Sequence, residues 1–301
     1  MSRTVIVGLD GSPESRAAAE WAAREAKLRE LPLKLVHVWE PVPAPMGQAP
    51  LLGAETQAHW TERIPREAAD GIRLRHPGLN VTVEQHTGRP AEVLADAARD
   101  AELLVLGSRG MSGIGGFMLG SVGLSTLAHT EHPVVLVRAG EQAADEHVAD
   151  PAGIPSAAGP YRAVVLGLDP TGPDDSVTEF AFEAAVRRDS ALRVVHGWIL
   201  PPYYAYALPA DPELFREVAQ HEAAALTEAL RPWREKYPTV EVVEDSRHGR
   251  PADLLTDASR EASLVVVGRR IRRSPFGAHI GPVTHSVLHH ATAPVAVVSH
   301  G

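Results

Sequence analysis

The stretch GSRGMSGIGGFMLGS, residues 107 to 121, is the part of the sequence best suited to chemistry. Its glycines allow the backbone to approach a charged group closely, and the stretch leads into a predicted helix that begins near Ser121. The N–H groups and the dipole at a helix N-terminus favour an anion. The spacing of Gly107, Gly110 and Gly120 before Ser121 therefore predicts a phosphate-binding loop.

Several common catalytic patterns are absent from the sequence. There is no G-x4-G-K-[ST] loop, and the candidate G-x-G-x-x-G that begins at Gly113 has Met118 in place of its last glycine. No G-x-S-x-G nucleophile motif occurs, and the chain contains no cysteine. These observations argue against a Walker-type ATPase, a Rossmann dehydrogenase and a serine esterase, and they exclude thiolate chemistry.

Three histidines near the C-terminus could bind a metal ion by their spacing. His285 and His289 stand four residues apart on a predicted helix, with His290 beside them, and such a pair can chelate zinc or nickel. The corresponding N-terminal positions lack the first two histidines, so metal binding is not part of the repeated pattern described next. We predict no metal site. His37 and His196, at the ends of paired strands, are expected to be buried and hydrogen-bonded.

An internal repeat sets the domain organisation. The segment TVIVGLDGS, which starts at residue 4, recurs as AVVLGLDPT at residue 163, an offset of 159. Later matches, such as HPVVLV at 132 and APVAVV at 293, are offset by 161. Residues 140–160 are rich in Ala, Gly and Pro without a hydrophobic period. We therefore predict domains at 1–139 and 161–301, joined by a linker at 140–160.

The elements that would position the loop are buried strands alternating with Ala-rich helices. Apolar runs without alternation occur at 5–9, 33–38, 103–106 and 134–137, which indicates strands buried on both faces of a parallel sheet. Each half is predicted to be an α/β domain, an open parallel five-stranded sheet with helices on both faces. Ligands of such sheets bind at the carboxyl ends of the strands, which here means just after Leu9, Val38 and Leu106.

The sequence resembles the universal stress protein family over nearly its whole length. The spacing G-x2-G-x9-G-S from Gly107 to Ser121 is similar to that family's nucleotide signature. The GLD-x-S start at residue 8, the H-V at residue 37 and the G-R-P at residue 88 fall in the same order, with counterparts in the second half. We identify the chain as a tandem member, for which the resemblance implies a Rossmann-like fold of the adenine nucleotide alpha hydrolase type.

The resemblance also implies a site for ATP, with or without magnesium, in the N-terminal half. The residues at the ends of the first two strands would hold adenine and ribose, and the glycine loop would hold the phosphates. The positions carried over are Leu9, Asp10, Gly11, Ser12, Val38, Gly107, Arg109, Gly110, Gly120, Ser121 and Val122. The alternative is that Asp10 and Ser121 merely cap helices. Gly123 stands where the family often has Ser or Thr, which would weaken phosphate binding.

The C-terminal copy of the motif is altered. Its counterpart residues are Asp169, Gly268, Arg270, Gly281, Val283 and Thr284. Ile271 replaces the second glycine and Pro282 replaces the serine, and proline supplies neither an N–H group nor a hydroxyl. Proline is tolerated at the first position of a helix, so the helix should form there. We expect a weakened second nucleotide site, although arginines 269, 270, 272 and 273 could hold an anion through their side chains or simply face solvent.

The composition of the chain argues against some classes of binding partner. A formal net charge of −9 argues against a sequence-independent grip on nucleic acid or on anionic lipid, and no apolar stretch is long enough to span a membrane. The absence of cysteine and of a signal-peptide pattern is compatible with a cytoplasmic protein. The expected partners are an adenine nucleotide, the other half of the chain and an unidentified regulatory protein; pairing of two chains is left open.

Three functional classes remain. The first is a nucleotide-dependent regulator, for which the resemblance implies a role in stress or dormancy. The second is a slow ATPase, which would need a positioned water and offers no general base beyond Asp10. The third is an interaction module with decayed sites, which the altered second motif supports for the C-terminal half alone.

Overall fold

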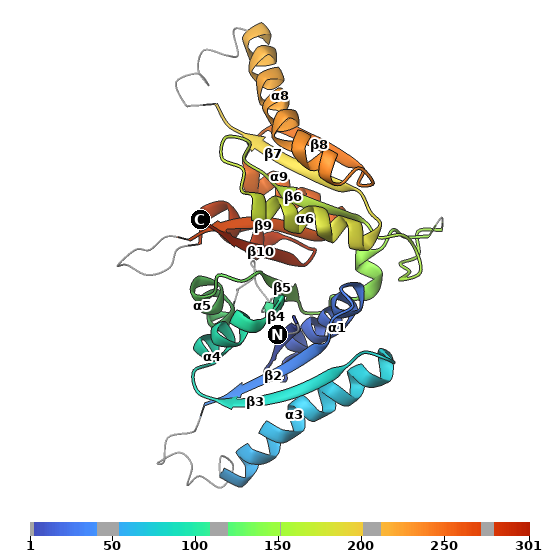
Figure 1. Cartoon of the computed structure of the whole chain (residues 1–301), viewed down its shortest axis with the longest axis vertical. Helices are drawn as coiled ribbons and strands as arrows, with labels where there is room; N and C mark the ends of the chain where they lie inside the picture. Colours follow the sequence, from blue (N-terminus) through green and yellow to red (C-terminus); the bar gives the residue numbers. More distant parts are fainter. Residues whose placement is uncertain (1–2, 41–53, 109–119, 151, 201–211, 272–279) are drawn as a thin grey trace. The chain divides into compact units, whose positions relative to one another are not determined.

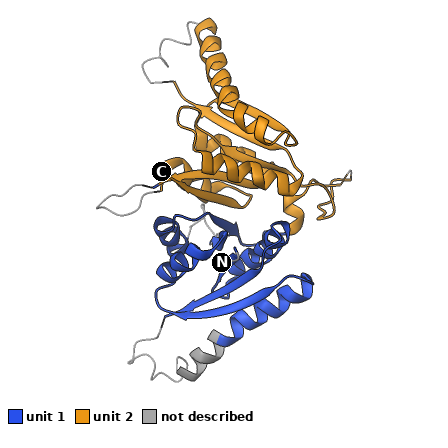
Figure 2. Ribbon diagram, in the orientation of Figure 1, with its two compact units in different colours: residues 1–142, 271–279 blue, residues 143–270, 280–301 orange. Residues whose placement is uncertain are grey.

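The computed structural model describes residues 3–40, 54–108, 120–150, 152–200, 212–271 and 280–301, with the backbone alone for 54–61. The chain divides into two compact units, the first comprising residues 1–142 and 271–279 and the second residues 143–270 and 280–301 (Figure 2). The division falls after residue 142, within the segment expected to be a linker. Each unit is an α/β domain built on a parallel sheet, as predicted.

Unit 1 contains five strands and four α-helices among its described residues (Figure 1). In chain order these are β1 Val5–Leu9, α1 Pro13–Leu28, β2 Leu33–Trp39, α3 Ala54–Arg75, β3 Val81–Thr87, α4 Pro90–Ala97, β4 Leu103–Ser108, α5 Ser121–His129 and β5 Val134–Arg138, with a short 3-10 turn at Ala98–Asp100. Neighbouring strands follow the order β3-β2-β1-β4-β5. All the pairings are parallel, with Val5 opposite both Leu33 and Leu103.

The helices of unit 1 cover both faces of its sheet because the strand order reverses at β1. The chain moves from β1 to β3 in one direction through α1 and α3, then crosses to β4 and β5 through α4 and α5. Right-handed crossovers place these two pairs of helices on opposite faces. The contacts agree, since α1 packs on β1, β4 and α3, whereas α4 packs on β2 and α5 (Figure 1).

Unit 2 repeats this architecture with the order β8-β7-β6-β9-β10, again all parallel. Its elements are β6 Ala163–Gly167, α6 Asp175–Arg188, β7 Leu192–Trp198, α8 Pro212–Lys236, β8 Val242–His248, α9 Pro251–Ala258, β9 Ala262–Arg270, α10 Pro282–His290 and β10 Val295–His300, with 3-10 turns at Ala143–Glu146 and Ser259–Glu261. Helix α10 begins at Pro282, as expected for a proline at the first helical position.

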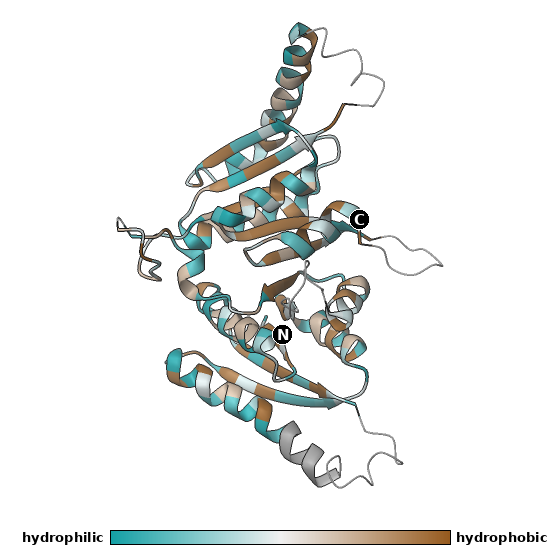
Figure 3. Ribbon diagram, turned by 180° about the vertical axis from the view of Figure 1, so that it is seen from behind, coloured by the Kyte–Doolittle hydropathy of each residue, from teal (hydrophilic) through white to brown (hydrophobic). Residues whose placement is uncertain are grey.

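The core of each unit lies between the sheet and the helices. All five residues of β1 are buried, and so are Leu103 to Leu106 of β4, which confirms the apolar runs as strands. Helix α1 buries six alanines, whose small side chains let the helix lie close to the sheet. The hydropathy view shows the same arrangement, with hydrophobic residues on the central strands and polar residues on the outer surfaces of the helices (Figure 3).

One strand of each half was not marked by an apolar run. Strand β3 has the burial pattern of an edge, with Val81 buried and Thr82 and Val83 exposed. It pairs on one side with β2 within its unit, so it needs few apolar residues. Proline-rich stretches follow the second strand of each half, at 41–50 and 201–212. They lie outside the described residues except for Pro212, the first residue of α8.

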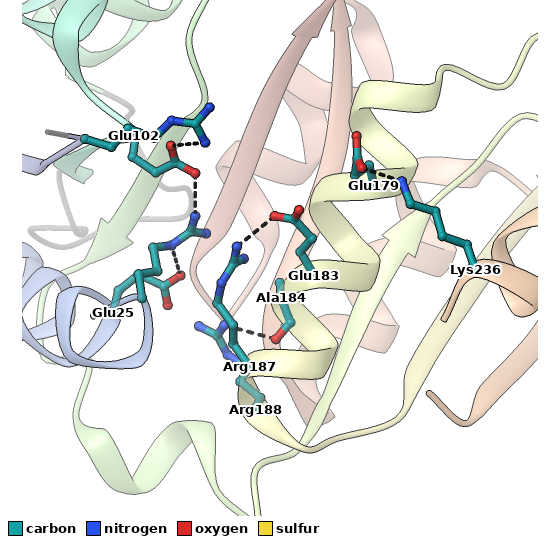
Figure 4. A network of polar contacts seen from close by, with 10 residues as sticks. Glu25, Glu102, Glu179, Glu183, Ala184, Arg187, Arg188 and Lys236 are labelled. Atoms are coloured by element: carbon teal, nitrogen blue, oxygen red, sulfur yellow. Dashed lines mark hydrogen bonds and ion pairs between the residues drawn. The ribbon is translucent and has the colours of Figure 1, made fainter. Parts of the chain in front are cut away.

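A repeated arginine is buried at the end of the first helix of each unit. In unit 1, Arg29 donates to Glu25 Oε1 at 2.7 Å and reaches Glu102 Oε1 at 3.5 Å (Figure 4). In unit 2, the counterpart Arg188 reaches the carbonyl of Ala184 at 3.4 Å and lies 4.0 Å from Glu146 Oε2, with both side chains almost fully buried. Glu146 belongs to the segment expected to be a linker, so this part of the segment packs into unit 2.

Candidate functional site

A cleft of about 500 Å³ opens at the carboxyl ends of the unit 1 strands. It lies where the strand order reverses between β1 and β4, the place at which open α/β sheets bind ligands. Its volume falls within the range of pockets for small molecules. Its walls are formed by Gly8, Leu9, Asp10, Ser12, Pro13, Glu14, Ser15, Val36, Val38, Pro90, Leu94, Leu106, Gly107, Gly120, Ser121, Val122, Gly123 and Ala139.

The end of β1 supplies one carboxylate of the cleft, and Glu14, in the first turn of α1, is a second acidic residue that lines it. Asp10 Oδ1 accepts a hydrogen bond from the Ser12 backbone N–H at 2.9 Å. The N-cap of α1 is Ser12, whose hydroxyl accepts from the Ser15 N–H at 3.1 Å. Asp10 is therefore not the cap of this helix, and the capping alternative does not explain why an acidic residue lines the cleft.

The start of α5 supplies backbone donors. Its N-cap is Gly120, which has no side chain to satisfy the first N–H groups of the helix, and Ser121 is the first helical residue. The Leu124 N–H closes the first turn onto the Gly120 carbonyl at 3.1 Å, so the N–H groups of residues 121 to 123 have no partner within the helix. Ser121 is not the cap either. These donors and the Ser121 hydroxyl border the cleft together.

Gly107, at the end of β4, allows the first turn of α1 to approach the strand. A Cβ atom at this position would lie 2.6 Å from the backbone carbon of Glu14 and 2.8 Å from the Ser15 nitrogen. Any side chain here would push the helix start away from the strand. The glycine is thus required by the close packing of two walls of the cleft, whatever ligand enters it.

The apolar part of the cleft comes from β2 and α4. Val36 and Val38 line it from β2, and Pro90 and Leu94 line it from α4. His37 lies between the two valines but is buried, with Nδ1 2.8 Å from the carbonyl of Leu9, which confirms the expectation for this histidine. The counterpart His196 is also buried, 3.3 Å from the carbonyl of Leu168 and 2.9 Å from Glu222 Oε2.

The structure brings together most of the predicted N-terminal site. Gly11 is not among the residues lining the cleft; it adopts a φ of 81° beside Ile64, a conformation suited to glycine. Arg109 and Gly110 lie outside the described residues. The predicted residues that line the cleft are Leu9, Asp10, Ser12, Val38, Gly107, Gly120, Ser121 and Val122.

Sequence reasoning missed the lining residues of α1 and α4, the one just after β5, and Gly8 and Val36 of the first two strands. The G-R-P triplet contains Pro90 and could have indicated it, but the sequence analysis uses the triplet only as evidence of family resemblance. Glu14, Ser15, Leu94 and Ala139 carried none, because the sequence does not indicate which turn of a helix faces a strand end.

The predicted C-terminal site residues are engaged differently. Asp169 Oδ1 accepts from the Thr171 N–H at 3.0 Å and from the Thr171 hydroxyl at 2.7 Å. The Thr284 hydroxyl is buried and donates to the carbonyl of Gly268 at 2.8 Å. Gly281 is the N-cap of α10, Val283 is half-buried in its first turn, and Arg270 is exposed at the end of β9. The carboxylate and the hydroxyl are thus used within the protein.

The histidine pair of α10 belongs to unit 2. The rings of His285 and His289 lie 4.5 Å apart between centroids. Partial burial, and then the nearby His289, lower the pKa of His285, so its neutral form is favoured. We keep the prediction that this pair is not a metal site.

Across the residues that the structure describes, no helix is both long enough and apolar enough to cross a bilayer.

The strand order and the cleft at its reversal place each unit among the doubly wound α/β domains. Residues 1–138 and 160–299 each match the model of the universal stress protein family. The chain belongs to this family, with two of its domains in tandem.

Similar proteins match this chain over nearly its whole length. A universal stress protein of Mycolicibacterium smegmatis is 34% identical, over 98% of this chain and 96% of its own. One of Mycobacterium tuberculosis is 33% identical, over 97% of this chain and 96% of its own. The crystal structure of a universal stress protein from Archaeoglobus fulgidus matches all of both chains with a TM-score of 0.68 at 18% identity, a likeness of fold.

Proposed function

We propose that unit 1 binds an adenine nucleotide, ATP with or without magnesium, and that the protein acts as a nucleotide-dependent regulator in stress or dormancy. The observation that carries the proposal is the composition of the cleft. It combines an apolar wall, the carboxylate of Asp10 and the N-terminus of α5, whose first N–H groups have no partner within the helix. These three features suit the three parts of a nucleotide, which are a flat base, a ribose with hydroxyl donors and an anionic phosphate.

The assignment of parts follows from the chemistry of each wall. Val36, Val38, Pro90 and Leu94 would contact the base, since burial of an aromatic ring needs apolar surface. Asp10 would accept from ribose hydroxyls, because an ionised carboxylate is an acceptor only. The start of α5 would hold phosphate through its N–H groups and Ser121. Arg109 and Gly110 remain predicted members of the phosphate site.

A regulatory role is supported by the position of Asp10, the carboxylate at the end of β1. Asp10 already accepts the Ser12 N–H, and its position at the end of β1 suits ribose better than a water at the terminal phosphate. We therefore propose retention of intact ATP in the cytoplasm, read out by a regulatory protein. Slow hydrolysis and a ligand-free interaction module are the alternative outcomes.

The first test is calorimetric titration of ATP and magnesium into the wild type and Ser121→Ala. We expect about one nucleotide per chain, bound tenfold or more weakly by the variant, because a hydrogen bond to a charged group contributes about 1.5–3 kcal/mol. Ser125→Ala is the matched control, since Ser125 lies on the same helix and does not line the cleft. Equal loss in both variants would indicate damage to α5 rather than to a ligand contact.

The paired aspartates offer a second test. Asp10→Asn should weaken ATP binding about tenfold, because it removes the charge that accepts from the ribose. Asp169→Asn, its counterpart in unit 2, should change the affinity by less than about twofold. Phosphate release over time in the wild type would show hydrolysis. If neither the wild type nor the two variants bind ATP, the interaction module is the better account.

A further inference from the structure

A smaller cavity, of about 200 Å³, lies in unit 2. It is formed by the end of α6, the turn that leads into β7 and the turn that leads into β8. Its lining residues are Ala185, Val186, Asp189, Ser190, Ala191, Thr239, Val240 and Glu241. Because both turns come directly before a strand, the cavity lies at the opposite edge of the sheet from the strand ends at which α/β sheets bind nucleotides.

The backbone around this cavity follows the same path in both units. Asp189, just after α6, has a φ of 46°, and its counterpart Glu30 has a φ of 54°. The next N–H group, of Ser190 or of Leu31, bonds back to a carbonyl in the last turn of the helix, at 3.2 Å and 2.9 Å. The two units therefore differ at this place in their side chains.

The first difference is in size and polarity. Ser190 stands where unit 1 has Leu31, so a short hydroxyl side chain replaces a larger apolar one. Ser190 Oγ is buried and has no hydrogen-bond partner among the residues that the structure describes. Buried hydroxyls in proteins are usually bonded, to the protein, to water or to a ligand. Ser190 thus offers an acceptor to a donor that enters the cavity.

The second difference is in charge. Asp189 and Glu241 both line the cavity, and within the described part of the chain neither carboxylate has a hydrogen-bond or ion-pair partner. In unit 1 the counterpart of Glu241 is Asn80, and Lys27 stands where unit 2 has Val186. The matching positions of unit 1 therefore hold one acid and one lysine, whereas those of unit 2 hold two acids and no basic residue.

The arginines closest in sequence are engaged elsewhere. Arg187 is bonded to Glu183 at 2.7 Å (Figure 4). Arg188 lies 4.0 Å from Glu146, with both side chains almost fully buried. The C-terminal end of α6 adds the negative end of the helix dipole to the two carboxylates. The cavity is therefore suited to a cation.

The lining also indicates which kind of cation fits. The volume is below the range of pockets for drug-sized molecules, so the ligand must be small. Val186 and Val240 give the cavity an apolar wall that suits methylene groups. A calcium ion would need six or more oxygen ligands, and no cluster of three or more acids or histidines that could hold a metal occurs among the described residues. An ammonium group has donors alone, which match carboxylates and Ser190 Oγ.

We propose that this cavity binds a small aliphatic ammonium compound, a short diamine in the simplest case. Its nitrogens would donate to Asp189, Glu241 and Ser190 Oγ, and its methylene groups would contact Val186. The site is independent of the nucleotide cleft proposed for unit 1. A bound diamine would stabilise unit 2, because the site exists only in the folded chain.

The test is an NMR titration of the wild type with 1,4-diaminobutane, which carries two positive charges at neutral pH. The titration is done without nucleotide, since ATP itself attracts diamines. Amide signals of residues 189–191 and 239–241 should shift and saturate at millimolar concentrations. The neutral analogue 1,4-butanediol has the same chain and should leave these signals in place.

Two variants give unit 2 the residues of unit 1. Ser190→Leu should fill the cavity, and Val186→Lys should bring an ammonium group of the protein to the acids. Each should weaken diamine binding at least about tenfold. Both should fold, since unit 1 carries these residues at matching positions of the same backbone. Ser190→Ala keeps the space open, so its affinity should stay within about fivefold of the wild type.

A third variant tests the charge alone. Asp189→Asn removes one carboxylate, and asparagine tolerates the positive φ at this position. The affinity should fall about three- to fivefold, as expected for an exposed ion pair. Glu217→Gln is the control, because it changes the net charge equally at an exposed position of α8 that does not line the cavity. Its affinity should equal that of the wild type.

The proposal is overturned if the diol shifts the same signals as the diamine, or if calcium does so and the diamine does not. It is also overturned if the shifts spread over the acidic surface without saturation, or if Ser190→Leu binds the diamine as tightly as Ser190→Ala. Should Ser190→Leu not fold, Asp189→Asn against Glu217→Gln decides. A wild type that binds the diamine but no ATP would refute the function proposed for unit 1 and support the site in unit 2.

Discussion

Polar side chains at the strand ends either line the cleft or form hydrogen bonds within the protein. The two units differ in which of these the matching residues do. Asp10 accepts one backbone N–H and still lines the cleft, while Asp169 spends one oxygen on both the N–H and the hydroxyl of Thr171. Ser121 borders the cleft, whereas the hydroxyl of Thr284 is bonded to the carbonyl of Gly268. Similar residue types therefore line the cleft in unit 1 and are hydrogen-bonded within the protein in unit 2.

Glu20, which lies outside the cleft, contributes to how the free energy of unfolding depends on pH in the acid range. Glu20 on α1 accepts from Arg75 Nε at 2.9 Å and lies 3.2 Å from His76 Nε2. Burial alone would raise the pKa of Glu20, but the bonds from Arg75 and His76 outweigh it and hold the pKa below 4.5. The stabilisation is therefore complete above pH 4.5 and is lost as the pH falls through the lower pKa of the folded state.

We expect Glu20→Gln to lower the free energy of unfolding by up to about 1 kcal/mol at pH 7, since the pair is partly exposed. The difference from the wild type should shrink as the pH falls below 4.5, where the wild-type carboxyl is protonated in the unfolded chain. Urea unfolding across this pH range measures it. Glu131→Gln, at an exposed position, is the control; a deficit that persists in acid would contradict the ion-pair explanation.

At the scale of elements, the two units differ in how closely the helix after β3 or β8 approaches the end of β2 or β7. Unit 1 has a valine at the end of β2 and keeps α4 away from it, while unit 2 has Gly197 and brings α9 into backbone contact. The same triplet, G-R-P, precedes both helices. The start of the first helix also differs, because α6 begins after Asp174 and not at the position that corresponds to Pro13.

Gly197→Ala should destabilise the protein by about 1–3 kcal/mol, because the added methyl meets the Pro251 backbone, which cannot move aside without shifting α9. Urea unfolding compared with Gly172→Ala gives the measurement. Gly172 has no atom within 4 Å of its Cβ position, so this control should change stability by less than about 0.5 kcal/mol. A neutral Gly197→Ala would show that the contact is looser than the structure indicates.

At the scale of the whole molecule, the proposed function gives two domains of similar fold different roles in ATP binding. If unit 1 alone binds ATP, the ligand stabilises one domain directly, by about 2.7 kcal/mol at a hundredfold excess over Kd. The regulatory signal would then begin in unit 1, and ATP would leave unit 2 unchanged. The cores of the two units are similar, but this is compatible with binding by unit 1 alone, because the units differ in the residues at their strand ends.

Hydrogen exchange tests this asymmetry on the intact chain. Saturating ATP should slow the exchange of amides in β1 and β4 by up to about a hundredfold, where exchange requires unfolding of unit 1. Amides of β6 and β9, the matched strands of unit 2, should keep their rates. Equal protection of both sets would contradict a single directly stabilised unit.

The sequence by itself determined the repeat, the α/β class and most strands, because buried parallel strands need continuous apolar runs and these are local. It also determined where the cleft lies, since strand ends follow from the runs. It did not mark β3, whose edge position needs few apolar residues. Only the tertiary structure decided which helix turn faces each strand end. The cavity beside Ser190 joins the end of α6 to the turn before β8, two segments far apart in the chain, so no local pattern specifies it.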